Sequence, residues 1–184
     1  QLPQKQFYER ADFPWLDAIE AATDAIRAES QAVGTGDAVY LWQNGELNEA
    51  NAALCPQTLA ALANAPLARI PGHSPSVLFS HMPPGTRLAP RNGPTNTRLQ
   101  VHLPLVAPGK CRLRVGNDVR ELQTGRAWIF DDSMEHEAWN DSDQARVLLQ
   151  FDIARPELTA DENRWVAKLL EGVDAFPGQK VDWK

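Results

Sequence analysis

Apolar residues in the first third of the chain recur every three or four positions, which is the spacing of one helix face. This spacing predicts a helix within residues 1–30, with Asp12 as its cap and Pro14 in its first turn. It also predicts a short helix over residues 56–64, and a strand over residues 38–42 lies between the two helices. The apolar face of the first helix is expected to contain Trp15, Ile19, Ala22 and Ile26.

From residue 76 onwards the pattern changes to short apolar or alternating runs separated by turn residues, which is typical of strands. Strands are predicted over residues 77–79, 98–106, 112–115, 118–122, 127–130 and 146–153. This succession predicts a mainly β fold, a sandwich or small barrel, in which two helices before it and one after it cover one sheet. The last helix should begin at a capping box of Thr159 and Glu162, with Trp165, Leu169 and Val173 on its apolar face.

Length and composition describe an ordinary globular protein of 184 residues. We expect one domain, made of a helical lead-in (1–66), a β core (70–158) and a C-terminal helix (159–176). The net charge of −6 gives no basic footprint for nucleic acid. Neither a membrane span nor a secretory leader is visible, so we expect a cytoplasmic protein without a membrane partner. Cys55 and Cys111 lack metal-site spacing and are expected to be buried, reduced thiols.

The region after the strand 127–130 carries the candidate chemistry. His136 follows this strand and the acidic pair Asp131–Asp132, and Arg146 opens the next strand. An imidazole can hold a metal and a guanidinium can grip a carboxylate, which together are what an iron/2-oxoglutarate oxygenase needs. On the strand 98–106, alternation puts Arg98 and His102 on one face. That face either lines a hydrated pocket or is exposed to solvent. Arg98 either contacts a substrate carboxylate or lies on the protein surface.

Several motifs of this chain resemble the aspartyl/asparaginyl β-hydroxylase family. They are GPTNTRL (93–99), VHLPL (101–105), VGN (115–117) and FDDSMEHEAWN (130–140), and the similarity extends to residues 7–8, 13–16, 146–151 and 156–159. The resemblance implies a double-stranded β-helix with a jelly-roll core, and Fe(II) and 2-oxoglutarate as cofactors. It implies hydroxylation of a small-molecule or peptidyl substrate, such as the β-carbon of an aspartyl or asparaginyl residue, a free or carrier-bound amino acid, or a lipid acyl chain.

The resemblance also implies roles for individual cofactor-binding residues. Arg146 matches the residue that pairs with the C5 carboxylate of 2-oxoglutarate, and Ser80 assists it. His102 matches a contact to the metal-binding end of the cosubstrate, and Met82 lines the same pocket.

His136 matches the second of the two histidines that hold iron in this family. By our own interpretation, Asp132 either holds a metal-bound water close to His136 or caps a turn. The family's first iron ligand is a histidine after a proline, two residues before the glycine of the GPTN motif. In this chain that position holds Arg91.

Arg91 cannot replace a histidine, because a guanidinium has no lone pair to offer and stays protonated. It also repels Fe(II), by ~4 kcal/mol per charge pair at ~4 Å with an effective dielectric of ~20. Three outcomes are compatible with the sequence. Iron is held weakly by His136 with a rearranged His102 or His81; or Arg91 binds an anion in a metal-free pocket; or the chain is an inactive variant. The protein is therefore either a hydroxylase or a catalytically degenerate relative that serves as an anion-binding or protein-interaction module.

Overall fold

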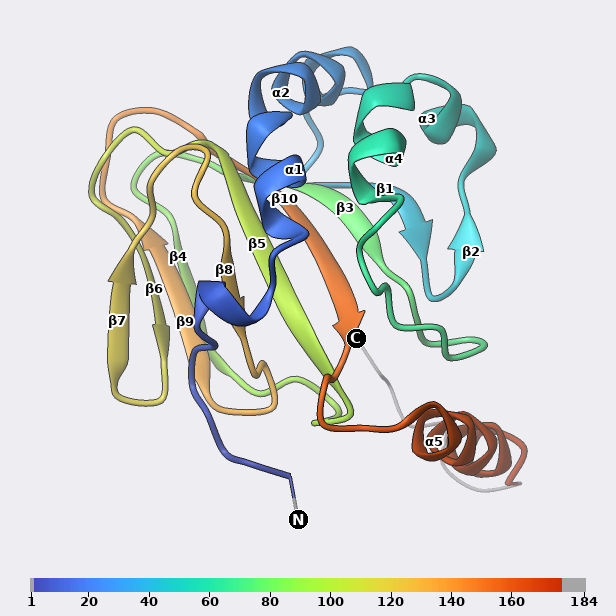
Figure 1. Ribbon diagram of the computed structural model, residues 1–184. Coiled ribbons are helices and arrows are strands. Elements are labelled where there is room, and N and C mark those ends of the chain that lie inside the picture. Colours follow the sequence, from blue (N-terminus) through green and yellow to red (C-terminus); the bar gives the residue numbers. More distant parts are fainter. Residues whose placement is uncertain (1, 177–184) are drawn as a thin grey trace.

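Two antiparallel sheets face each other in the computed structural model, which describes residues 2–176 (Figure 1). The larger sheet has the order β2-β1-β3-β10-β5-β8. Its strands are β1 (Ala38–Gln43), β2 (Glu46–Leu47), β3 (Val77–Met82), β5 (Arg98–Val106), β8 (Trp128–Phe130) and β10 (Arg146–Ala154). The smaller sheet has the order β4-β9-β6-β7. Its strands are β4 (Arg87–Arg91), β6 (Cys111–Val115), β7 (Asp118–Glu121) and β9 (His136–Asn140). The predicted mainly β, jelly-roll fold is confirmed.

Helices cover the outer face of the larger sheet (Figure 1). They are the 3-10 helix η1 (Arg10–Asp12) and the α-helices α1 (Leu16–Ala21), α2 (Thr23–Ala32), α3 (Glu49–Ala53) and α4 (Pro56–Leu62). The single helix predicted within residues 1–30 is divided into α1 and α2 at Ala22. Its predicted apolar face is confirmed, because Ile19 and Ile26 are buried in the core. The predicted cap is wrong. Asp12 lies inside η1, and Trp15 occupies the N-cap of α1 without a side-chain hydrogen bond.

Alternation along β10 divides its side chains between two cores. Leu149 and Phe151 pack under the helices, whereas Leu148 packs against the smaller sheet. Since side chains alternate across a strand, Arg146 and Gln150 share the inner face with Leu148. The polar side chains of Arg146 and Gln150 therefore face the space between the two sheets.

The strands β4 and β9 were not predicted. β4 contains Pro90, which cannot donate to a sheet ladder, but β4 is an edge strand, where proline is tolerated. A bulge lies between Leu88 and Arg91, because two residues of β4, Ala89 and Pro90, oppose one residue of β9, Glu137. In β9 the alternation of buried His136, Ala138 and Asn140 with the intervening residues is present in the sequence but short.

The last helix, α5 (Ala160–Asp174), has the predicted capping box of Thr159 and Glu162. Its predicted apolar face, however, does not cover a sheet. Trp165 and Leu169 are each 67% exposed, and α5 lies beside the sandwich (Figure 1). The reason is that both faces of β10 are already covered, one by the helices and one by the smaller sheet. The predicted end of this helix, at residues 176–178, lies partly outside the described residues.

No helix among residues 2–176 is long and apolar enough to cross a bilayer. Cys55 and Cys111 are buried and unpaired with each other, as predicted.

One buried guanidinium joins the segments at the end of the sandwich where the chain begins. Arg155 Nη1 donates to Asp131 Oδ2 at 2.7 Å and to the Asn96 carbonyl at 2.8 Å. Its Nη2 donates to the Pro3 carbonyl at 2.5 Å and to the Tyr8 hydroxyl at 2.7 Å. This side chain thus bonds to the N-terminal arm and to two loops at once, beside the backbone hydrogen bonds that join the arm to residues 129–131.

We predict that Arg155→Ala lowers the free energy of unfolding by about 3–5 kcal/mol, because it leaves the Asp131 carboxylate buried without its partner. Urea denaturation measures this change. Arg164→Ala is the matched control, since Arg164 forms an exposed ion pair with Asp161 on α5, and it should cost less than about 1 kcal/mol. Equal effects of the two substitutions would contradict the proposed role of Arg155.

Candidate functional site

The four residues predicted to bind the cosubstrate share the inner face of the larger sheet. Arg146 pairs with Met82, Leu148 with Ser80, and Gln150 with His102, and partners in an antiparallel ladder point to the same side. Ser80, Met82, His102 and Arg146 therefore share the face of the larger sheet that is turned towards the smaller sheet, and we call this region between the sheets the cleft. His81 lies next to Ser80 in sequence and points to the opposite face.

Arg146 is buried to 1% exposure. Its Nε has no hydrogen-bond partner, and it forms no ion pair with any acidic side chain in residues 2–176. Burial, aided by the nearby charge of Arg91, lowers the pKa of its guanidinium to about 10. The group is still protonated at neutral pH. An unpaired buried charge costs several kcal/mol, so this position strongly favours an anionic ligand.

His136 is buried in the same cleft, on β9 of the facing sheet. Its Nδ1 lies 3.0 Å from the Met134 carbonyl. A carbonyl only accepts, so Nδ1 carries the proton and Nε2 keeps its lone pair for a ligand. Burial lowers the pKa of this imidazole, which favours the neutral form that a metal requires.

Arg91 stands directly opposite His136 in the ladder between β4 and β9. The bulge before Arg91 brings it to the face that His136 occupies. Within the described part of the chain, no group of three or more histidine, cysteine or acidic side chains is placed to hold a metal. The residues present therefore do not fit an iron ion held by two histidines, since the first position carries a cation.

His102 and His136 both contact one aromatic ring. The Phe130 ring lies 4.7 Å from the His102 ring and 5.8 Å from the His136 ring, measured between centroids. Gln150 Nε2 lies 3.0 Å from His102 Nε2 and donates to it. Burial lowers the pKa of His102 well below its usual value, so the ring is neutral. Its role as a cosubstrate contact or substitute ligand stays a prediction.

Arg98 and Asp132 belong to a buried polar network at the end of the cleft strands. Arg98 Nη1 donates to Asp152 Oδ2 at 2.6 Å, and its Nη2 lies 4.0 Å from Asp132 Oδ2. The Arg98 side chain is 13% exposed, so it is not a surface arginine. Asp132 packs against Gly93, where a Cβ would collide with the carboxylate. The roles of Arg98 at a substrate and of Asp132 at a metal-bound water stay predictions.

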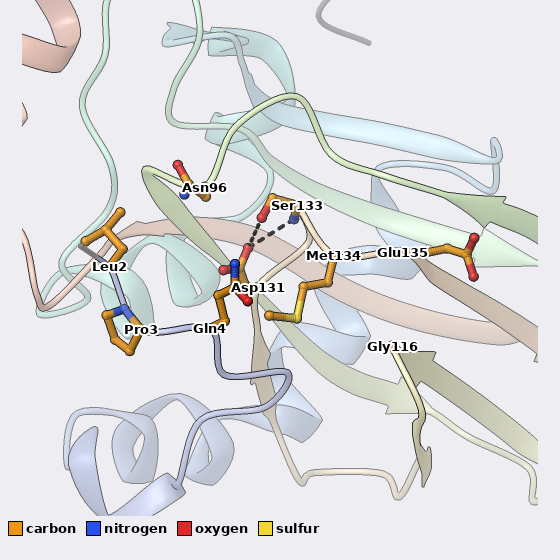
Figure 2. A pocket seen from close by; sticks show the side chains of 9 residues that line it. All are labelled: Leu2, Pro3, Gln4, Asn96, Gly116, Asp131, Ser133, Met134 and Glu135. Carbon is orange, nitrogen blue, oxygen red and sulfur yellow. Dashed lines mark hydrogen bonds between the residues drawn. The ribbon is translucent and has the colours of Figure 1, made fainter.

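A second pocket, of about 600 Å³, lies at the start of the loop that leads into β9. The arm residues Leu2 and Pro3 border one side, and Met134 and Glu135 border the other (Figure 2). Asp131 forms its floor and accepts hydrogen bonds from the Ser133 amide and hydroxyl. Sequence reasoning did not find this pocket, because the N-terminal arm that borders it is held by contacts with residues distant along the chain, such as Arg155 and Asp131. None of the cleft residues named above lines it.

Comparison with known proteins gives a consistent family assignment. The family model described as aspartyl/asparaginyl beta-hydroxylase matches residues 16–156. The aspartyl/asparaginyl beta-hydroxylase of Mus musculus is 40% identical over 126 residues, which are 67% of this chain and 17% of that protein. The ornithine lipid ester-linked acyl 2-hydroxylase of Rhizobium tropici is 37% identical over 182 residues, covering 85% of this chain and 63% of that protein. The chain thus spans less than two thirds of either relative.

Solved structures show only a distant similarity. The Schizosaccharomyces pombe Cnp3 cupin domain is 13% identical, with a TM-score of 0.42, over 57% of this chain and 67% of that chain. A similarity this distant says nothing about the site.

The buried carboxyl of Asp132 provides a prediction about pH. Burial raises its pKa to about 6, although Arg98 opposes the shift. Between pH 4 and 6 the folded state therefore holds a proton that the unfolded state has lost, so the free energy of unfolding falls as pH rises. Asp132→Asn should remove this decrease and raise the free energy of unfolding by about 3 kcal/mol at pH 7.5. The difference between the variant and the parent protein should shrink towards pH 4.

Urea denaturation across this pH range measures the effect. Asp143→Asn is the matched control, since Asp143 is exposed, and its difference from the parent protein should be small at every pH. A pH-independent effect of Asp132→Asn would show that the carboxyl is ionised in the fold at both ends of the range.

Proposed function

Because this chain belongs to the aspartyl/asparaginyl β-hydroxylase family, we propose that it is a 2-oxoglutarate-dependent hydroxylase whose Fe(II) site is altered at position 91. The observation that carries the proposal is the buried guanidinium of Arg146, which has no acidic partner among residues 2–176. Charge-assisted pairing with a carboxylate is the interaction that this group lacks. The distal carboxylate of 2-oxoglutarate supplies it.

The neighbours of Arg146 suit the rest of this ligand. Ser80 offers a hydroxyl on the adjacent strand, across from Leu148. His102 offers a neutral ring whose orientation is fixed by Gln150. Met82, across from Arg146, gives the carbon chain an apolar wall. A polar, partly apolar cleft of this kind is typical of a small-molecule site.

The substrate follows from the family in class only. The relatives' names describe an aspartyl/asparaginyl beta-hydroxylase and an ornithine lipid ester-linked acyl 2-hydroxylase. We propose a small-molecule or peptidyl substrate whose carbon–hydrogen bond is hydroxylated. The acidic net charge of −6 disfavours nucleic acid as a partner, and a cytoplasmic location stays a prediction.

Position 91 favours a second candidate, a catalytically degenerate module that binds an anion or a protein. Arg91 occupies the register position opposite His136, where the family places its other histidine. With one nitrogen donor and an opposing cation, hydroxylation by this chain is expected to be slow. The two candidates share the cosubstrate pocket and differ in turnover.

We predict that Arg91→His raises the rate of succinate formation from 2-oxoglutarate, with Fe(II) and O₂, by at least about 100-fold, because it removes ~4 kcal/mol of repulsion and adds a ligand. In that background, Arg146→Ala should weaken 2-oxoglutarate binding by ~2 kcal/mol or more. Succinate release measures the first change and calorimetric titration the second. Equal turnover before and after the change at position 91 would show that Arg91 leaves the iron site clear. Absence of succinate and of 2-oxoglutarate binding in both proteins would reject the hydroxylase proposal.

A further inference from the structure

Two arginines of the cleft have no acidic partner in the part of the chain that the structure describes. Arg146 comes from the larger sheet, and Arg91 comes from the edge strand of the smaller sheet. Arg98 and Arg155, which are also largely shielded from water, are each paired with an aspartate, at 2.6 Å and 2.7 Å respectively. Among the described arginines that are not exposed, Arg146 is therefore the one whose charge has no acidic partner.

Arg91 reaches the cleft because of the bulge in β4. Leu88 pairs with Ala138 and Arg91 with His136, so one extra residue is accommodated between them. Without the bulge, Pro90 would take the position opposite His136. Arg91 is exposed, whereas His136 is buried, so Arg91 lies at the mouth of the cleft and Arg146 at its floor. The charge of Arg91 lowers the pKa of Arg146, His102 and His136, which places all three within its field.

The charges facing this space sum to about two. Arg91 and Arg146 are the two cations here, while His136 Nδ1 lies 3.0 Å from the Met134 carbonyl and His102 Nε2 accepts from Gln150. The acidic residues nearest in sequence to His136 are engaged elsewhere. Glu135 and Glu137 both bind Arg114, at 2.8 Å and 2.5 Å. A ligand with two negative charges matches the cleft, and a divalent cation does not.

We propose that Arg91 and Arg146 together clamp a dicarboxylate of the 2-oxoglutarate class between the two sheets without a metal ion. This inference rests on the proposed 2-oxoglutarate site at Arg146. It adds that Arg91 takes the place of iron at the other end of the ligand. One carboxylate pairs with Arg146 at the floor, and the second pairs with Arg91 at the mouth. His136 donates from neither nitrogen to this ligand, since Nδ1–H is engaged by Met134 and Nε2 is an acceptor.

A clamp and a metal site differ in what they require of the ligand. A metal chelates the keto group together with its neighbouring carboxylate, so glutarate, which lacks the keto group, binds a metal site poorly. Two guanidinium groups contact only the carboxylates. The clamp therefore binds glutarate and 2-oxoglutarate with similar affinity and rejects 2-oxobutyrate, which has a single carboxylate.

Calorimetric titration of the full chain in excess EDTA tests the clamp with these three compounds. Glutarate and 2-oxoglutarate should bind, and Arg91→Gln should weaken both by about 10- to 100-fold, the effect of removing one charge-assisted contact. Arg87→Gln is the matched control. Arg87 lies on the same strand and contacts the Trp139 ring, so its loss removes the same charge without touching the cleft.

The Arg91→His variant separates this inference from the proposed function. It should lose affinity in EDTA and gain a Mn(II)-dependent affinity that prefers 2-oxoglutarate over glutarate. If the natural chain binds 2-oxoglutarate only with added metal, or if Arg91→Gln binds as tightly as Arg87→Gln, the clamp is overturned while the 2-oxoglutarate site stands. If neither the natural chain nor Arg91→His binds with or without metal, the proposed function fails and the clamp fails with it.

Discussion

The buried guanidinium of Arg155 is the constraint on which the frame of this protein depends. It joins the carboxylate of Asp131, the carbonyls of Pro3 and Asn96, and the hydroxyl of Tyr8, each at hydrogen-bond distance. These groups come from the N-terminal arm, the loop before β5 and the loop before β9. Since the loop before β9 leads directly into His136, the position of the cleft histidine is fixed by a contact made outside the cleft.

Arg146 is also a buried guanidinium, but unlike Arg155 it has no acidic partner among residues 2–176. It is as deeply buried as Arg155, yet it faces a space lined by His102 and His136 instead of a carboxylate. A fold keeps an unpaired buried charge only at a cost in stability, and such positions concentrate at binding sites. Arg155 is therefore paired with groups of the protein itself, whereas Arg146 is left to pair with a ligand. Arg91 adds a second cation at the position where a metal ligand is expected.

The predictions that succeeded were those that rest on local pattern. Alternation put Arg98 and His102 on one face of β5, and the capping box placed the start of α5 at Thr159. The prediction that α5 covers a sheet failed because it needed knowledge of neighbours. The apolar face of α5 around Leu169 stays exposed, because the sheet it would cover is already covered.

The sequence by itself determined the family, the mainly β fold and the identity of the residues at the cleft, because motif, alternation and turn chemistry are local properties. Only the tertiary structure decided what these residues face. The bulge of β4 sets Arg91 opposite His136, the ring of Phe130 contacts both His136 and His102, and Arg98 pairs with Asp152. Such contacts join segments distant along the chain, so no local pattern contains them.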